Sequence, residues 1–142
     1  MKKILIINAN YYENISSLLT DNTKKIFIKY KIKNDIIKVP GIFEIPVTIR
    51  KYIKNYDGFV ALGCVIKGET PHFDLICKST FDAIIKMSVD YNKPIGNGII
   101  TALNMKQAVA RSSTNKNSKK PNKGLEAAKA VIAVLKNEPK KT

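Results

Sequence analysis

Apolar residues fall into two kinds of pattern that alternate along the chain. Four short segments are rich in aliphatic residues and are bounded by turn-forming residues, as β-strands are. The longest of these segments is almost continuously apolar, which is typical of a parallel strand covered on both faces. The four predicted strands are Lys3–Asn8, Asp35–Val39, Gly58–Ile66 and Ile95–Thr101.

Between the strands, apolar residues recur at intervals of three and four, which predicts amphipathic helices. The first helix begins near Glu13, but its end is open because residues 26–32 also alternate as a strand does. Thr70 is a credible N-cap with Pro71 at the first helical position, and Asn104 is a second N-cap. The other predicted helices cover residues 43–54, 71–91, 105–111 and 123–137.

Strands that alternate with helices predict a three-layer α/β/α sandwich around a central four-stranded parallel sheet. In such sheets, ligands bind outside the carboxyl ends of the strands. The segments that follow the first three strands are therefore candidate site segments. They are Asn8–Tyr12, Val39–Glu44 and Lys67–His72.

Length and composition indicate one globular domain over residues 1–142, with 138–142 as a frayed tail. The longest apolar run, Phe59 to Ile66, is far shorter than the ~20 residues of a membrane helix. No signal-peptide pattern is visible, so we expect a cytoplasmic protein without a membrane partner. Cys64 and Cys77 have no metal or redox spacing, and we expect reduced, buried thiols.

The charge balance is strongly basic, with 25 Lys and Arg against 11 Asp and Glu and a formal net charge of +14. Such a field attracts nucleic acids, acidic lipids and phosphorylated metabolites. Two interpretations stay open: an anionic partner, or a lysine excess from an AT-rich coding sequence, which the many Ile, Asn and Tyr residues also indicate. Only Arg50 and Arg111 are arginines, and lysine is the weaker reader of bases.

His72, the only histidine, lies at about the second position of the helix that follows the most apolar strand. A helix N-terminus disfavours the imidazolium, so a neutral ring there can shuttle a proton, although a lone histidine is more often an ordinary surface residue. Gly68-Glu69-Thr70 precedes the same helix, whose N-terminus suits an anion. A plain turn is the alternative interpretation.

Three further residues carry candidate chemistry. Glu44 lies between two prolines in Val39–Pro46, either in a rigid pocket wall or in a stiff turn. Tyr11 has the shape to stack on a flat heterocycle, or it packs on its neighbours. Arg111, beside a lysine-rich loop, suits a phosphate clamp or simply stabilises a helix C-terminus.

Four segments together resemble the 6,7-dimethyl-8-ribityllumazine synthase family of riboflavin biosynthesis, over nearly the whole chain. They are Val39–Pro46, Leu62–Asp74, Gln107–Arg111 and Asn122–Ala128. The resemblance implies a flavodoxin-like fold and a first helix that extends to about Lys31. It also implies condensation of 5-amino-6-(D-ribitylamino)uracil with 3,4-dihydroxy-2-butanone 4-phosphate, the penultimate step of the pathway, without a metal or organic cofactor.

The resemblance further implies a role for each matching residue. His72 would shuttle protons, and Gly68, Glu69, Thr70 and Arg111 would bind phosphate. The ribitylaminouracil would contact Tyr11, Ile42, Phe43, Glu44, Val65, Ile66, Asn97, Ile99 and Lys123. Of these, Asn97, Ile99, Arg111 and Lys123 would come from the neighbouring subunit, with Lys123 assisting Arg111. Three positions depart from the family pattern: Tyr11 stands for Phe or Trp, Asn97 for an aromatic residue, and Ala102-Leu103 for a more polar pair.

Family members are pentamers, and some pack twelve pentamers into a shell. The long lysine-rich loop Ser112–Asn122, the net charge and the missing N-terminal segment predict an isolated homopentamer. Association with riboflavin synthase is a further expectation. The alternatives are a basic, non-catalytic α/β domain that binds nucleic acid and a relative that only binds flavin or lumazine. The pocket motif, His72 and Arg111 argue against both, so we expect small-molecule substrates rather than nucleic acid.

Overall fold

The computed structural model describes residues 2–114, 121–137 and 139 of the chain. Strands and helices alternate along it, as the sequence predicts. The strands are β1 (Lys3–Ala9), β2 (Lys33–Val39), β3 (Gly58–Ile66) and β4 (Ile95–Ala102). The helices are α1 (Glu13–Lys29), α2 (Ile45–Lys51), α3 (His72–Tyr91), α4 (Met105–Ser112) and α5 (Lys123–Lys136), and a short 3₁₀ helix, η1 (Ile42–Glu44), precedes α2.

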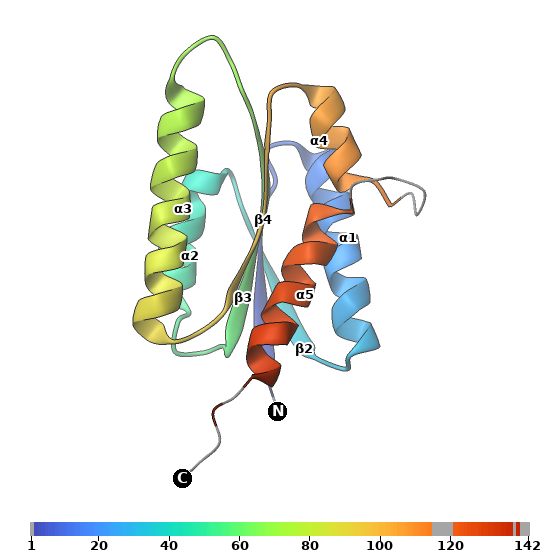
Figure 1. The fold of residues 1–142 in the computed structure, drawn as a ribbon, viewed down its shortest axis with the longest axis vertical. Coiled ribbons are helices and arrows are strands. Elements are labelled where there is room, and N and C mark those ends of the chain that lie inside the picture. The colour runs from blue at the N-terminus through green and yellow to red at the C-terminus, as the bar shows by residue number, and fades with distance from the viewer. Residues whose placement is uncertain (1, 115–120, 138, 140–142) are drawn as a thin grey trace.

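All four strands are parallel, in the order β2-β1-β3-β4. The chain runs outward from β1 to β2 and then crosses back to β3, so the strand order reverses beside β1. Helices α2 and α3 cover one face of the sheet, and α1, α4 and α5 cover the other (Figure 1). This arrangement confirms the predicted three-layer sandwich with flavodoxin-like topology.

Each face of the sheet has its own apolar cluster, because successive residues of a strand point to opposite faces. Ile4 and Ile6 of β1 pack with residues of α1 and α5, whereas Leu5 and Ile7 pack with residues of α2. All four side chains are fully buried. The near-continuous apolar runs of β1 and β3 follow from this coverage on both faces.

The ambiguous segment 26–32 is helical only as far as Lys29. The adjacent residues Ile26 and Phe27 are both buried and Ile28 is 73% exposed, whereas a strand would place Ile26 and Ile28 on one face. Lys31 has a φ of 56°, and this left-handed residue turns the chain into β2. The helix therefore ends two residues before the expected Lys31, and the strand interpretation of this segment is wrong.

The helix expected over residues 43–54 is also shorter than predicted. The chain first makes the tight turn η1, and α2 then ends at Lys51 and continues as hydrogen-bonded turns to Asn55. Pro46 lies in the first turn of α2, where its missing N–H costs no helical hydrogen bond. The predicted place of Pro46 in a first helical turn is confirmed, although the helix begins at Ile45 and not at Phe43.

Helix α5 lies against bare backbone of β4, and glycine makes this close approach possible. A Cβ atom at Gly96 would lie 2.4 Å from the carbonyl oxygen of Ala127 in α5. Real Cβ atoms do not approach an oxygen so closely, so any side chain at this position must displace the helix. Gly68, in contrast, has no atom within 4 Å of the place where its Cβ would lie.

We predict that Gly96→Ala lowers the free energy of unfolding by about 1–3 kcal/mol, the usual cost of overpacking. Urea denaturation measures this change as a lower midpoint. Gly68→Ala is the matched control, because the added methyl group meets open space; its effect should stay within about 0.5 kcal/mol. Equal effects of the two substitutions would contradict the close contact between α5 and β4.

Candidate active site

Three of the predicted site segments lie at one edge of the sheet. They follow β1, β2 and β3, which are neighbours in the sheet and all end at that edge (Figure 1). Parallel strands deliver their following loops to the same edge, so residues far apart in the sequence come together there. We call the side chains of these loops the carboxyl-edge group.

The loop after β2 is closed by Glu44. Its carboxylate Oε1 accepts a hydrogen bond from the Gly41 N–H at 3.0 Å, and its own N–H donates to the Gly41 carbonyl at 3.2 Å. This reciprocal bonding is a capping box, and it fixes the partly buried carboxylate in one place. Both interpretations of Glu44 therefore hold: it stiffens the turn and it lies in a pocket wall.

The two neighbours of this carboxylate behave differently. Phe43 is 66% exposed, whereas Ile42 is 4% exposed and belongs to the core between the sheet and α2. A Cβ at Gly63 would lie 2.8 Å from the Ile42 methyl group, so the glycine makes room for this side chain. Ile42 can consequently offer a ligand only its backbone, while Phe43 offers its ring.

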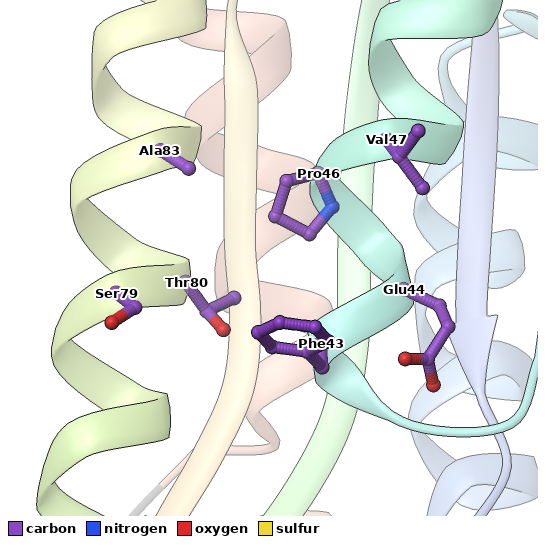
Figure 2. A pocket seen from close by; sticks show the side chains of 7 residues that line it. All are labelled: Phe43, Glu44, Pro46, Val47, Ser79, Thr80 and Ala83. Atoms are coloured by element: carbon purple, nitrogen blue, oxygen red, sulfur yellow. The ribbon is translucent and has the colours of Figure 1, made fainter.

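Phe43 and Glu44 also line a pocket of about 420 Å³ between α2 and α3. Figure 2 shows the Phe43 ring directed towards Thr80 of α3, with Glu44 on its other side. The Thr80 hydroxyl is buried and has no hydrogen-bond partner among the residues that the structure describes. Thr80 belongs to the predicted helix 71–91, and its place in the sequence gives no sign of a pocket. The remaining lining residues are Pro46, Val47, Ser79 and Ala83.

Tyr11 extends from the end of β1 and is 76% exposed. Its ring meets that of Tyr12 edge to face, with centroids 4.9 Å apart and planes at 77°. Tyr12 is anchored in turn, because its carbonyl accepts the N–H groups of Ile15 and Ser16 at the start of α1. Partial burial raises the pKa of the Tyr12 phenol, so this ring stays neutral. The exposed ring of Tyr11 is thus held against Tyr12, which the start of α1 fixes in place.

The segment between β3 and α3 differs from the prediction in its details. The helix begins at His72, with Pro71 as the residue before it, and no side chain caps it. Thr70 is therefore not the N-cap that the sequence indicated, and His72 is the first helical residue, one position earlier than expected. Residues 67–70 and His72 are exposed. Because no side chain of the described residues engages the first-turn N–H groups, they are available to an anion.

Arg111 and Lys123 lie together, but on the other face of the sheet from α3 (Figure 1). The Arg111 guanidinium donates to the Pro121 carbonyl at 3.1 Å and to Glu126 Oε2 at 2.9 Å. Lys123 Nζ lies 3.8 Å from the same carboxylate oxygen. Sequence analysis missed Glu126, although its place three residues after Lys123 in a predicted helix was a usable signal. We call Arg111, Lys123 and Glu126 the basic triad.

Asn97 and Ile99 lie on β4, the edge strand of the sheet, apart from both groups. Asn97 Oδ1 accepts a hydrogen bond from the Ile99 N–H at 3.1 Å, which satisfies a donor on the open edge of the strand. Ile99 is 2% exposed, so its side chain is not accessible to a ligand or a second chain. Asn97 is partly exposed and keeps its amide group available.

The other residues that the sequence singled out lie at the end of β3 and in α3. Val65 and Ile66 are partly buried at the end of β3 and point to opposite faces of the sheet. Cys64 and Cys77 are free and buried, as predicted, and burial raises the pKa of the Cys64 thiol to about 11. Such a thiol is a poor nucleophile at neutral pH. Within the described ranges, no His, Cys, Asp and Glu side chains cluster as metal ligands do.

Comparison with known proteins identifies the family to which this chain belongs. The family profile described as 6,7-dimethyl-8-ribityllumazine synthase matches residues 1–138. The chain belongs to the 6,7-dimethyl-8-ribityllumazine synthase family. It is an enzyme of riboflavin biosynthesis with lumazine synthase activity, and the resemblance seen in the sequence is confirmed.

Individual lumazine synthases match the chain over most of their length. The protein of Bartonella bacilliformis is 41% identical over 136 residues, which are 93% of this chain and 87% of the relative. That of Campylobacter jejuni is 37% identical over 138 residues, covering 94% and 87%. That of Paramagnetospirillum magneticum is 34% identical over 144 residues, covering 95% and 93%. No helix of the described chain is long and apolar enough to cross a membrane.

Proposed function

We propose that the carboxyl-edge group and the basic triad are two halves of one active site, which two neighbouring subunits of the lumazine synthase complete. The separation of the two groups by the sheet supports this proposal. Within one chain, Arg111 cannot reach an anion at the start of α3, because the sheet and its side chains lie between them. A second chain can supply the missing half.

In the proposed site, His72 moves the protons. The amine of the ribitylaminouracil attacks the ketone of the butanone phosphate, and an imine forms with loss of one water. Phosphate then leaves, and the ring closes with loss of water. Each step needs a proton to be taken or given. His72 is exposed at the mouth of the carboxyl edge, where both substrates have access to it. Holding the two substrates together supplies much of the remaining acceleration.

The phosphate binds at the start of α3 in this proposal. Gly68, Glu69 and Thr70 form the exposed loop before the helix, and the uncapped N–H groups of the first turn point to the same place. Anions are favoured there by the free donors and by the helix dipole. Arg111 of the neighbouring subunit adds a planar, doubly donating cation, and Lys123 adds a second charge. The phosphate then competes with Glu126 for both cations.

The ribitylaminouracil occupies the loops after β1 and β2. Tyr11 offers an exposed ring for stacking on the pyrimidine, and Glu44 holds a fixed carboxylate for ribityl hydroxyls. Ile42, Phe43, Val65 and Ile66 line the pocket, with Ile42 acting through its backbone. Asn97 and the Ile99 backbone of the neighbouring subunit close it.

The same proposal requires an oligomer, and we propose a homopentamer. The outer faces of α2 and α3 carry exposed aliphatic side chains that a neighbouring subunit would cover. Val47 is 60% exposed, Leu75 67%, Ile85 62% and Val89 73%. A closed ring with head-to-tail contacts brings a different face of each neighbour to this surface, as a shared site demands.

We predict that His72→Ala lowers kcat by about 100-fold, the lower end of general acid–base effects, because these substrates also react without a catalyst. Lumazine fluorescence measures the rate. Lys78→Ala is the control, since Lys78 is exposed on the same helix and pairs only with Asp82. A kcat within twofold of the parent enzyme would remove His72 from the mechanism.

For Arg111→Ala, we expect the KM for the butanone phosphate to rise about tenfold or more, while the KM for the ribitylaminouracil changes much less. The guanidinium binds the phosphate group, which only one substrate carries. Steady-state kinetics with each substrate varied in turn gives both values. Equal increases would show that Arg111 supports the fold or the interface instead.

Refolding His72→Ala and Arg111→Ala chains together tests whether the site is shared. In mixed rings, about a quarter of the sites combine an intact His72 with an intact Arg111 from the neighbour, because each is present half of the time. Assayed with the butanone phosphate well below its KM, where both single variants are slow, the mixture should therefore return to about that fraction of the parent rate. A mixture as inactive as its two components would mean that each chain forms its site alone.

The assembly itself is predicted to be an isolated pentamer at physiological salt. The high positive charge of each chain opposes close packing of pentamers, and the loop 112–122 is long. Residues 115–120 of that loop lie outside the described residues. Light scattering decides the question: a mass of five chains agrees with the prediction, and a hollow particle of sixty chains contradicts it.

A further inference from the structure

Five lysines of this chain are gathered at one place that the proposed reaction does not use. Residues 22–34 include five lysines and no acidic residue. They lie in the last turns of α1, in the turn that follows and at the start of β2, and all five are exposed. Figure 1 shows this region at the opposite end of the sheet from the loops of the carboxyl-edge group. The five residues are Lys24, Lys25, Lys29, Lys31 and Lys33.

These five lysines make no ion pair with the described residues, unlike two lysines of α3. On α3, Lys78 pairs with Asp82 at 2.7 Å, and Lys86 pairs with Asp90 at 2.8 Å. None of the five makes an ion pair within residues 2–114, 121–137 and 139. The dipole at the end of α1 stabilises cations only within its last turn, which includes Lys29 but not Lys31 or Lys33. The remaining repulsion is relieved when an anion binds.

An aromatic ring lies among these charges. Tyr30 is 41% exposed, and the Lys29 Nζ lies 5.7 Å from the centre of its ring. Lys136, from the end of α5, places its Nζ 4.6 Å from the same centre. A flat ring between cations offers a surface for a base beside binding positions for phosphates. We call the five lysines, Tyr30 and Lys136 the basic patch.

We propose that the basic patch binds single-stranded nucleic acid without sequence preference. Repeated phosphates match the row of lysines, and an unpaired base can stack on Tyr30, as the bases of a duplex cannot. Lysine contacts the backbone as a point charge and reads base edges poorly, so no sequence preference is expected. A bilayer fits less well, because the apolar stripe of α1 is buried in the core and Ile28 alone extends beside Tyr30.

This proposal revises the expectation that nucleic acid is not a partner. Sequence analysis weighed nucleic-acid binding only as an alternative to catalysis, because the charge had no known location. The structure places the basic patch at the amino ends of the strands and the substrate loops at their carboxyl ends (Figure 1). The two functions therefore occupy separate surfaces of one chain.

The test uses two variants with equal net charge. Lys25, Lys29 and Lys33 are changed to Gln in the first, and Lys51, Lys54 and Lys106, which are exposed but lie outside the basic patch, are changed to Gln in the second. Fluorescence anisotropy of a labelled oligouridine measures binding over a range of salt concentrations. The first variant should bind at least about tenfold more weakly, and its salt slope should fall by roughly 2, since each lost phosphate contact contributes about 0.7. The second should bind like the parent enzyme.

A third variant, Tyr30→Leu, should lower the affinity about tenfold and leave the salt slope unchanged, because it removes stacking and no charge. Lumazine formation should be unaffected in all three variants, so failure of the proposed active site would be seen separately. Equal loss of binding in the two lysine variants would overturn the proposal in favour of a general charge effect. So would binding to phosphatidylserine vesicles in place of oligouridine, or no binding to either.

Discussion

Parallel pairing of four short strands is the constraint on which the rest of the molecule depends. Because the strands run in one direction, every connection has to cross the sheet, and helices cover both faces. The same geometry sends the loops after β1, β2 and β3 to one edge. Tyr11, Glu44 and His72 are far apart in the sequence and reach the same edge of the sheet only because the strands before them are neighbours. A different strand order would disperse them.

Groups that suit anions lie at both the carboxyl edge and the amino edge of the sheet, because the helices that cover it begin at one edge and end at the other. At the carboxyl edge, the uncapped start of α3 offers free N–H groups that suit the phosphate of a substrate. At the amino edge, the end of α1 and the start of β2 present five exposed lysines that form no ion pair with the described residues, and Lys29 lies near the Tyr30 ring. Groups that suit an anion therefore lie at both edges of the sheet. The carboxyl edge has the backbone N–H groups at the start of α3, and the amino edge has the lysine side chains at the end of α1 and the start of β2.

Glu126 links the fold to the proposed shared site. In a single chain, its carboxylate occupies both Arg111 and Lys123 and keeps two like charges close together. Partly exposed ion pairs of this kind contribute little to stability, typically up to about 1 kcal/mol. A phosphate group can therefore replace the carboxylate at small cost, which agrees with the proposal that these cations act in the site of a neighbouring subunit.

The sequence by itself determined the class of fold, the four strands and the residue types at the site, because hydrophobic period and long motifs are local properties. It also placed Asn104 correctly as an N-cap and Pro46 in a first helical turn. It misplaced the C-terminal end of α1 and the start of α3, where single residues, Lys31 and Pro71, determine the boundary. Only the tertiary structure showed that Ile42 and Ile99 are core side chains, that Glu126 holds Arg111, and that the unpaired lysines lie away from the substrate loops. Those facts depend on which segments pack side by side, and contacts across the sheet leave no periodic signal in the chain.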